Sequence, residues 1–470
     1  MPTIRRMRGF LTSSIGVTCA AALALPLTLP SSTARAAPPG VKTASSAKEA
    51  PVAAAAPGAE GIPGSTQSLP LAPLGSDRSA GPAEREQGLT RRDVRPFSLV
   101  GVVWDDPADE LHGTVQVRTR ASGTSTWSGW QHVETHNHEH AADPGTLERG
   151  TGKVRGSTAP LWVGDSDGVE IRVRAEADRH ADRAPTGSLL PKGLRLELVD
   201  PGDEPPPRGG PAEVPRATAM TAEAAAASAV NAELAPLDAA VIPALTKRRT
   251  EADLIAARGG SEAVGKARPY IGPRPRIITR KGWGADERIR ERNFAYTKTV
   301  KAAFVHHSAS GNNYRCSQSG SVLRSIYRYH VRSSGWRDFG YNFAVDRCGN
   351  IYEGRAGGVA KPVLGAHTRG FNAKSMGIAV LGTYSRATPP KAAVNAIARL
   401  TAWKLGLYGA NPRGTTYLKS GGGNLYKKGR NVRLRVISGH RDGFATECPG
   451  SRLYNKLGKA RSSSARMQGR

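Results

Sequence analysis

Only two stretches of this 470-residue chain carry the regular spacing of large apolar residues that a folded core requires. Residues 37–93 and 201–272 are rich in Ala, Pro, Gly and Ser, and such segments bury too little surface to offset the entropy of ordering them. We therefore expect a disordered spacer at 37–93 and an Ala/Pro-rich linker with some helical tendency at 201–272. Folded domains are predicted at 94–200 and 273–462, followed by a basic tail at 463–470.

Residues 1–36 have the composition of a secretory signal. Three arginines precede an apolar stretch at residues 15–29, and Ala34-Arg35-Ala36 forms a small-x-small cleavage site. The alternative is an uncleaved anchor, but the apolar stretch is short and interrupted for a membrane span. We expect cleavage to leave no transmembrane anchor and to place a secreted or cell wall-associated protein outside the membrane.

The positive charge is concentrated in the C-terminal part of the chain. The whole sequence has 67 Lys and Arg against 39 Asp and Glu, and residues 271–470 hold 37 of the basic and 8 of the acidic residues. Nucleic acid is the usual partner of such a basic block. Export argues against it, so we expect anionic wall polymers to be attracted and no nucleic acid to be bound.

The first patterned segment, residues 94–200, alternates apolar and polar residues in short runs separated by Gly and Asp. Val115, Val117 and Thr119 show this period of two, as do Leu194, Leu196 and Leu198 in other runs. The pattern predicts a small all-β, antiparallel domain of the sandwich type. Its position alone indicates an accessory or targeting module.

The second patterned segment, residues 273–462, mixes helical and strand spacing. Helices are predicted around residues 323–330 and 394–400, the second with Thr388 as its N-cap. Strands are predicted at residues 303–307, 341–346, 378–382 and 434–438. The alternation favours an α/β domain built on one sheet.

Three cysteines lie beyond residue 36, which is an odd number for an exported protein. We expect Cys316 and Cys348 to form a disulfide, because one follows a strand closely and the other lies in a predicted hairpin turn. Cys448 is then alone and is either buried or bound to a metal ion. His440, eight residues earlier, gives a weak metal signal, so these residues alone favour burial.

His306 and His307 end the apolar strand at 303–307 and strengthen the metal hypothesis. Alternation places one of them on each side of the sheet, so at most one is a ligand. One strand-end histidine with His440 and Cys448 would give three protein ligands and one open position, the arrangement of a catalytic zinc site. His307 and His330 are otherwise predicted to pack in the core. The run His132, His136, His138 and His140 lies among Glu and Asn, which predicts a solvated loop.

Six sequence motifs, in order, resemble the peptidoglycan recognition proteins and the type 2 N-acetylmuramoyl-L-alanine amidases. They are FVHHSA at 304–309, GWRDFGYNF at 335–343, IYEGR at 351–355, GAHTRGFN at 365–372, SMGI at 375–378, and GHRD at 439–442 followed by TECP at 446–449. The match covers residues 275–460, and the overall layout resembles exported actinobacterial members.

The resemblance implies a mixed central sheet with flanking helices and a zinc cleft. It implies one catalytic Zn²⁺ held by His306, His440 and Cys448, with Tyr341 and Thr446 as catalytic residues. It further implies substrate binding by His367, Asn372 and Arg355, although Arg355 could instead pair with Glu353. The expected activity is hydrolysis of the amide between the lactyl group of N-acetylmuramic acid and L-Ala of the stem peptide, by a monomer. The alternative is a non-hydrolytic protein that binds or senses peptidoglycan.

Overall fold

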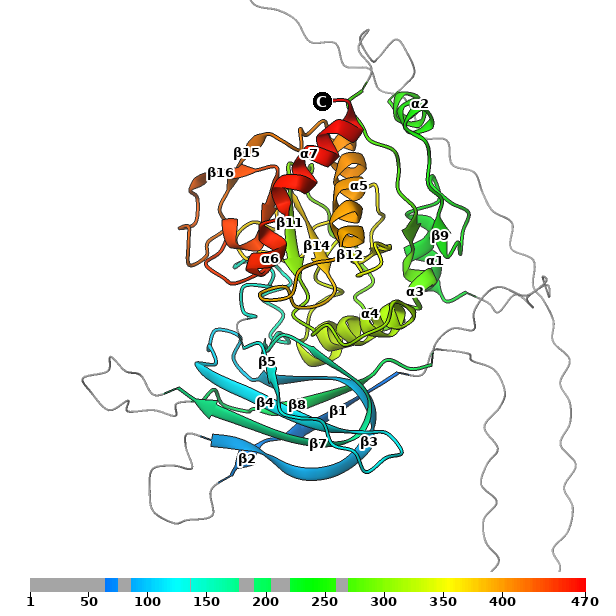
Figure 1. The fold of residues 1–470 in the computed structure, drawn as a ribbon. Coiled ribbons are helices and arrows are strands. Elements are labelled where there is room, and N and C mark those ends of the chain that lie inside the picture. The colour runs from blue at the N-terminus through cyan, green and yellow to red at the C-terminus, as the bar shows by residue number, and fades with distance from the viewer. Residues whose placement is uncertain (1–63, 75–85, 136, 177–189, 204–219, 259–268) are drawn as a thin grey trace, which may run out of the picture. The chain divides into compact units, whose positions relative to one another are not determined.

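A computed structural model describes residues 64–74, 86–135, 137–176, 190–203, 220–258 and 269–470 (Figure 1). The expected signal at 1–36 and most of the expected spacer lie outside the described residues. Among the described residues, no helix combines the length and apolarity needed to cross a membrane.

The N-terminal domain is an antiparallel sheet of eight strands that includes the alternating segments. Its main strand order is β1 (Ser65–Pro70), β8 (Arg195–Asp200), β3 (Glu86–Trp104), β7 (Leu161–Ala175), β4 (Gly113–Ala121) and β5 (Gln131–Val133). The short strands β2 (Ala72–Pro73) and β6 (Gly156–Ser157) also pair with β3. Apolar residues of these strands form one buried cluster, which includes Val115, Val117, Leu196 and Leu198. The all-β expectation is therefore confirmed, and hydrogen bonding connects these strands into one continuous sheet.

The N-terminal domain begins earlier than residue 94. Strand β1 pairs with β8 over its whole length, from Ser65 opposite Asp200 to Pro70 opposite Arg195. The side chain of Gln67 also donates to the carbonyl of Arg95 at 2.8 Å. Residues 65–70 and 86–93 are thus strand, and the spacer prediction is wrong for them, because pairing to distant strands replaces the apolar residues that this segment lacks.

The C-terminal domain is built on a mixed sheet of seven strands, as expected. Their order is β17 (Ile437–Gly439), β11 (Ala302–His307), β14 (Ser375–Val380), β12 (Phe343–Val345), β13 (Ile351–Glu353), β10 (Ile277–Ile278) and β9 (Val241–Ile242). β11 is parallel to both β14 and β17, and β12 is parallel to β14. A separate hairpin consists of β15 (Thr415–Lys419) and β16 (Asn431–Arg435).

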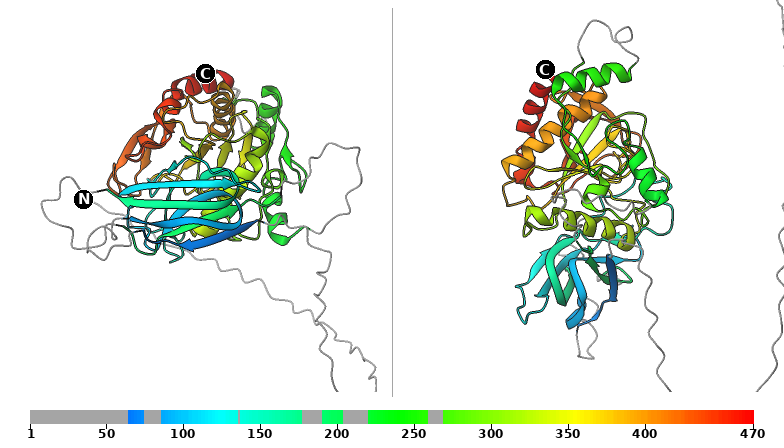
Figure 2. Two further views of the ribbon diagram at one scale, coloured as in Figure 1. Left: turned by 60° about the horizontal axis from the view of Figure 1, so that its bottom comes forward. Right: turned by 90° about the vertical axis from the view of Figure 1, so that its right-hand side faces the viewer.

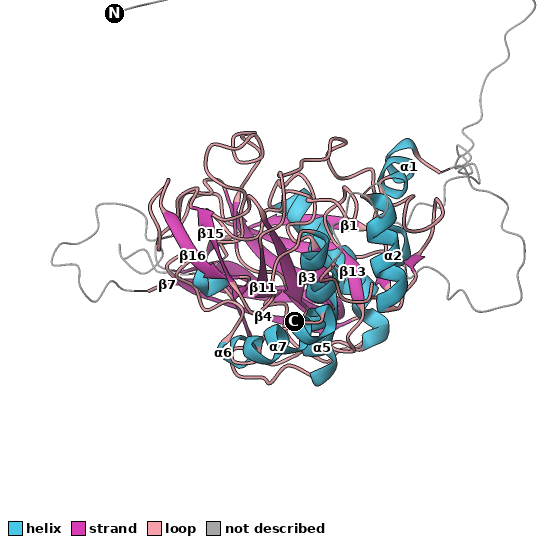
Figure 3. Cartoon of the chain, turned by 90° about the horizontal axis from the view of Figure 1, so that it is seen from above, coloured by secondary structure: helices cyan, strands magenta, loops and turns pink. Residues whose placement is uncertain are grey.

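Helices cover both faces of this sheet (Figures 2 and 3). Helices α5 (Lys391–Leu407) and α7 (Leu457–Gln468) pack against each other, and α5 shares a core with Val305 and Ile378. Helix α4 (Ser319–Arg328) and the π-helical turn η2 (Tyr329–Ser333) belong to a second core with Ala344 and Ala379. The short helices are α3 (Arg280–Trp283), α6 (Ser451–Tyr454), η1 (Cys316–Gln318) and η3 (His440–Asp442).

Two predicted helix boundaries differ from the structure. Helix α5 has Pro390 as its N-cap, two residues after the expected Thr388. Helix α7 runs to Gln468, so most of the expected basic tail is helical, and its Ser464 and Gln468 are buried. The hydroxyl of Ser464 contacts that of Thr401 in α5 at 3.1 Å, which is a tertiary contact that composition does not reveal.

The expected linker at 201–272 contributes helix α1 (Ala222–Ala229), strand β9 and helix α2 (Lys247–Ala257). Threonine hydroxyls cap both helices, and Ile242 and Leu254 are buried in the core of the C-terminal domain. The Ala-rich composition therefore predicted helical tendency correctly but hid the few apolar residues that anchor this segment.

The two domains share apolar contacts. Leu99 and Trp162 of the N-terminal sheet lie in the same buried cluster as Val322 and Ile326 of α4. The hydroxyl of Tyr329 lies 3.2 and 3.1 Å from the carbonyl oxygens of Val102 and Thr158, respectively. The N-terminal sheet thus covers the α4 face of the C-terminal domain.

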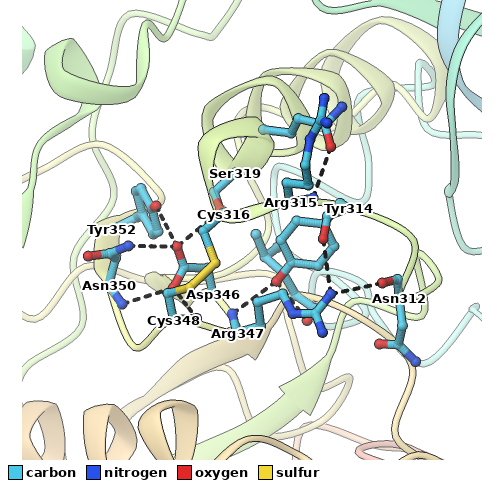
Figure 4. Close-up of a disulfide and its surroundings, with 12 residues drawn as sticks. Asn312, Tyr314, Arg315, Cys316, Ser319, Asp346, Arg347, Cys348, Asn350 and Tyr352 are labelled. Atoms are coloured by element: carbon cyan, nitrogen blue, oxygen red, sulfur yellow. Dashed lines mark hydrogen bonds between the residues drawn. A yellow bond between two sulfur atoms is a disulfide. The ribbon is translucent and has the colours of Figure 1, made fainter. Parts of the chain in front are cut away.

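Cys316 and Cys348 form a disulfide, as expected, with a Cα–Cα distance of 6.2 Å (Figure 4). Asp346 organises the hairpin turn beside it. One of its carboxylate oxygens accepts the amide of Cys348 at 3.0 Å, and the other accepts the hydroxyls of Ser319 at 3.0 Å and Tyr352 at 2.8 Å. The bridge therefore ties the start of α4 to the turn between β12 and β13.

Candidate functional site

The fold brings His306, His440 and Cys448 together at one edge of the C-terminal sheet. Strands β11 and β17 are parallel neighbours, with Val305 opposite Gly439. His306 is the next-to-last residue of β11, and His440 follows directly on β17, so both histidines lie at the carboxyl ends of adjacent strands. The amide of Arg441 donates to the carbonyl of Cys448 at 3.0 Å. This hydrogen bond holds the loop after η3 so that Cys448 lies close to His440.

Two pairs of donor atoms lie at separations that fit a tetrahedral zinc ion. The distance from Cys448 Sγ to His306 Nδ1 is 3.7 Å. A second pair, His440 Nδ1 and Nε2 of His140, is 3.1 Å apart. Zinc–ligand bonds of normal length at tetrahedral angles would separate S and N by about 3.6 Å and two N atoms by about 3.3 Å. The donor set is therefore chemically and geometrically suited to zinc.

Burial keeps the imidazoles of this group neutral. His306 and His440 are 0% exposed, and burial, together with neighbouring histidines, lowers the pKa of each well below its ordinary value. Burial also raises the pKa of the Cys448 thiol. A neutral imidazole offers a lone pair to a metal ion, whereas the thiol must release its proton when a metal binds.

His140 is the fourth member of the group, and the sequence prediction for it was wrong. One donor atom from each of His140, His306, His440 and Cys448 lies within 4.8 Å of the others. His140 is 5% exposed although it belongs to the segment between β5 and β6 of the N-terminal domain. His132 is exposed as expected but lies in strand β5 and not in a loop, while His136 lies outside the described residues. His138 is half-buried beside Glu110.

Tyr341 and Thr446 both lie beside this group. The ring centroids of Tyr341 and His306 are 5.2 Å apart, and Tyr341 is 4% exposed. The hydroxyl of Thr446 accepts the amide of Cys448 at 3.1 Å and donates to Oε1 of Glu139 at 2.7 Å. Thr446 thus connects the loop that carries Cys448 to the residue before His140.

The three expected substrate-binding residues have different surroundings. His367 is fully buried, its ring centroid is 5.3 Å from that of His306, and burial lowers its pKa to about 3. Asn372 Nδ2 donates to the carbonyl of Ala141 at 2.8 Å and to the carboxylate of Asp143 at 2.7 Å. The ring of His367 therefore packs beside that of His306, and Asn372 forms hydrogen bonds with the N-terminal domain.

Arg355 pairs with Glu148, also of the N-terminal domain, instead of with Glu353. The pair is bidentate, at 2.9 and 2.7 Å, and both side chains are at most 7% exposed. Glu353 instead accepts hydrogen bonds from the side chain of Asn231 and the amide of Arg280. The ion-pair alternative for Arg355 is thus realised with a partner that is 207 residues away.

His307 and His330 pack in the core, as expected. His307 Nδ1 accepts the amide of Tyr384 at 3.2 Å, and burial lowers its pKa to about 4. The ring of His330 stacks on Trp336 at 4.4 Å, and burial lowers its pKa to about 3. Neither histidine belongs to the group of donor atoms.

Sequence reasoning missed one whole segment of the site. Residues 137–149, named here the covering loop, include Glu139, His140, Asp143 and Glu148, and all four contact the predicted site residues. The closely spaced histidines from His132 to His140 were the available signal. Nothing in the sequence indicates that a loop of the N-terminal domain reaches the C-terminal one.

Comparisons with known proteins agree with this architecture. Residues 296–451 match the family described as N-acetylmuramoyl-L-alanine amidase, and residues 51–190 match the family described as Rv3811 N-terminal galactose-binding domain-like. Peptidoglycan-recognition protein SC2 of Drosophila melanogaster is 31% identical over 183 residues, which are 38% of this chain and 84% of that protein.

Two further matches cover the same part of the chain. The N-acetylmuramoyl-L-alanine amidase of Homo sapiens is 30% identical over 188 residues, which are 39% of this chain and 28% of that protein. The solved structure titled Drosophila PGRP-LB wild-type is 27% identical, with a TM-score of 0.30, and covers 38% of this chain and 91% of that one. From the SC2 match and the amidase family match, we conclude that the chain belongs to the family of peptidoglycan recognition proteins and type 2 N-acetylmuramoyl-L-alanine amidases.

Proposed function

We propose that the protein is a zinc-dependent amidase of peptidoglycan, which cleaves between the lactyl group of N-acetylmuramic acid and L-Ala of the stem peptide. The observation that carries the proposal is the convergence of His306, His440 and Cys448, each of which offers a donor atom within 4.8 Å of the others. Zinc, when bound, supplies a Lewis acid that polarises the scissile carbonyl and lowers the pKa of the attacking water.

Tyr341 is the residue best suited to stabilise the oxyanion. Burial, with smaller contributions from Cys448 and Glu139, raises the pKa of its phenol well above the ordinary value, so the phenol remains a hydrogen-bond donor. A donor of this kind is worth about 3–4 kcal/mol in comparable oxyanion sites. Thr446 accepts the amide of Cys448 and so positions the thiolate ligand.

We further propose that the protein acts outside the cell, as a secreted or cell wall-associated monomer. The disulfide between Cys316 and Cys348 supports an oxidising compartment. The excess of basic residues after residue 270 supports attraction to anionic wall polymers in addition to peptidoglycan.

The test is hydrolysis of a purified disaccharide-peptide, followed by mass spectrometry of the released peptide. A new L-Ala amino terminus that disappears on zinc chelation and in Cys448→Ala supports the proposal. His132→Ala is the matched control, because this exposed histidine on β5 lies outside the donor group. Hydrolysis that survives both metal removal and Cys448→Ala would contradict the mechanism.

Non-hydrolytic binding of peptidoglycan is the second candidate, and one observation favours it. With His140 the site has four protein donors, the number typical of a structural zinc site. A permanently closed site predicts that insoluble peptidoglycan retains the protein without the appearance of new amino termini.

A further inference from the structure

The covering loop engages nearly every predicted site residue that could meet a substrate. Its Glu139 accepts from Thr446, its His140 faces His440, and its Glu148 pairs with Arg355. The loop and the catalytic residues also line one small cavity, which includes Glu139, His140, Tyr341 and Thr446. A substrate and this loop therefore compete for the same place.

The contacts of the loop resemble those of an anionic peptide. The carbonyl of Ala141 and the carboxylate of Asp143 accept from Asn372, and Asp143 also accepts the amide of Gly370 at 2.8 Å. Glu148 places a second carboxylate on Arg355. The stem peptide of peptidoglycan offers the same chemistry, namely backbone carbonyls and free carboxylates.

His140 adds the one group that a stem peptide lacks. Its Nε2 lies 3.1 Å from His440 Nδ1, while its Nδ1 is buried and has no hydrogen-bond partner among the described residues. The ring of His140 also lies close to the site histidines and to Tyr341, with centroid distances of 4.5 Å to His440 and 5.9 Å to Tyr341. His140 thus occupies the fourth donor position, beside the phenol proposed to stabilise the oxyanion.

We propose that the covering loop is an internal occupant of the substrate groove, with His140 as a displaceable fourth zinc ligand and with Asp143 and Glu148 in the places of substrate carboxylates. The chain is then folded in a closed state, and hydrolysis requires the loop to withdraw. This inference rests on the proposed amidase function. It reconciles four donors with catalysis, because withdrawal of His140 would restore three protein ligands and one open position.

The loop is electrostatically suited to this role. Residues 137–149 contain three acidic residues and one arginine, whereas residues 271–470 hold 37 basic and 8 acidic residues. The attraction holds the loop in place, and a polyanionic wall polymer would compete with it for the same basic residues.

The first experiment reads the metal coordination directly, without activity. The full-length chain is loaded with Co²⁺ in place of zinc, and its visible spectrum is recorded while azide is added as an external ligand. We expect azide to leave the wild-type spectrum unchanged, because four protein donors fill the coordination sphere, and to shift the spectrum of His140→Ala. His132→Ala should respond as the wild type does. An identical azide response in wild type and His140→Ala would overturn the inference.

The second experiment measures hydrolysis of the disaccharide-peptide by the same variants with zinc supplied in excess. We expect His140→Ala to be faster than wild type by roughly tenfold or more, because the fraction of competent molecules rises. Asp143→Asn, which loosens the loop without changing a metal donor, should also be faster and covers the case in which His140→Ala misfolds. Slower hydrolysis in both variants with retained zinc would overturn the inference and make the loop part of the catalytic machinery.

The two experiments separate the inference from the proposed function. If azide shifts the Co²⁺ spectrum of His140→Ala only, and no variant hydrolyses the disaccharide-peptide, the occluding loop is supported and the amidase proposal is refuted. Equal hydrolysis in all variants with equal azide responses supports the amidase and refutes the occlusion.

Discussion

The ion pair between Glu148 and Arg355 gives the most direct measure of how firmly the covering loop is held. Both side chains are at most 7% exposed, and the two hydrogen bonds are 2.9 and 2.7 Å long. Breaking a buried pair by removing one partner costs about 3–5 kcal/mol, because an uncompensated charge remains. In Glu148→Ala, Arg355 still donates to the carbonyls of Phe339 and Leu364, so we expect a cost at the lower end of this range, about 3 kcal/mol.

A loss of about 3 kcal/mol corresponds to a rise of roughly 100-fold in the fraction of open loops. Hydrogen exchange at Arg369 and Gly370 reports this opening, because their amides donate to the backbone of Glu139 and to the carboxylate of Asp143. We expect both amides to exchange faster by that factor in Glu148→Ala, with no comparable change in the amides of β11.

The control for this prediction is Glu170→Ala, which removes a more exposed ion pair with Arg118. Such pairs are worth at most about 1 kcal/mol, so exchange at Arg369 and Gly370 should not change. Unchanged exchange in Glu148→Ala would refute the reasoning, because the ion pair would then not stabilise the closed loop. Faster exchange of the β11 amides to the same extent would also refute it, because the pair would then stabilise the whole fold and not the loop.

The same pair predicts a dependence of loop closure on pH. Burial alone would raise the pKa of Glu148, but the charge of Arg355 and its hydrogen bonds hold it below the ordinary value. A carboxylate with a lowered native pKa stabilises the closed state above its unfolded pKa of about 4.3, and this contribution is lost as the pH falls through the native pKa. After correction for intrinsic exchange rates, loop opening should therefore increase below about pH 4. In Glu148→Gln, which has no carboxyl group to titrate at this position, loop opening should depend less on pH.

Three further outcomes are expected. Replacing Cys316 and Cys348 by serine should lower the free energy of unfolding by roughly 4 kcal/mol on the chain-entropy model, since the bridge spans a sequence separation of 32. Denaturant titration measures this free energy, and a change below about 1 kcal/mol would contradict the prediction. Tyr341→Phe should lower kcat by about 100-fold or more while zinc content stays constant, and an unchanged kcat would exclude the phenol as oxyanion donor. Cys448→Ser should bind zinc more weakly in a competition titration with a chromogenic chelator, and equal affinity would remove Cys448 from the ligand set.

The sequence predicted well what depends on local periodicity and on motifs. The strand ending at His307, the helix through Ile326, and the mixed sheet were all expected and are present. The resemblance also named His440 and Cys448, which the parallel pairing of β11 and β17 brings beside His306. These features depend on side-chain patterns within a few residues or on the motifs that carry the family resemblance.

Features that depend on contacts between distant segments were missed. His140 looked like part of a solvated loop because its neighbours are polar, yet its position is determined by His440, 300 residues away. Strand β1 and helix α2 lie in segments that look like spacer or linker, and they are anchored by pairing with β8 and by burial of Leu254. Composition reports how much surface a segment can bury by itself, but not what another segment offers to it.

The core shared by the two domains limits how the C-terminal domain can be produced without the N-terminal one. Val322 and Ile326 of α4 are buried against Leu99 and Trp162, so a fragment that begins at residue 269 would expose an apolar face. The N-terminal sheet packs closely on that fragment, since a Cβ added at Gly101 would clash with the ring and hydroxyl of Tyr329. A C-terminal fragment therefore needs either polar substitutions on α4 or another domain that covers the same apolar face.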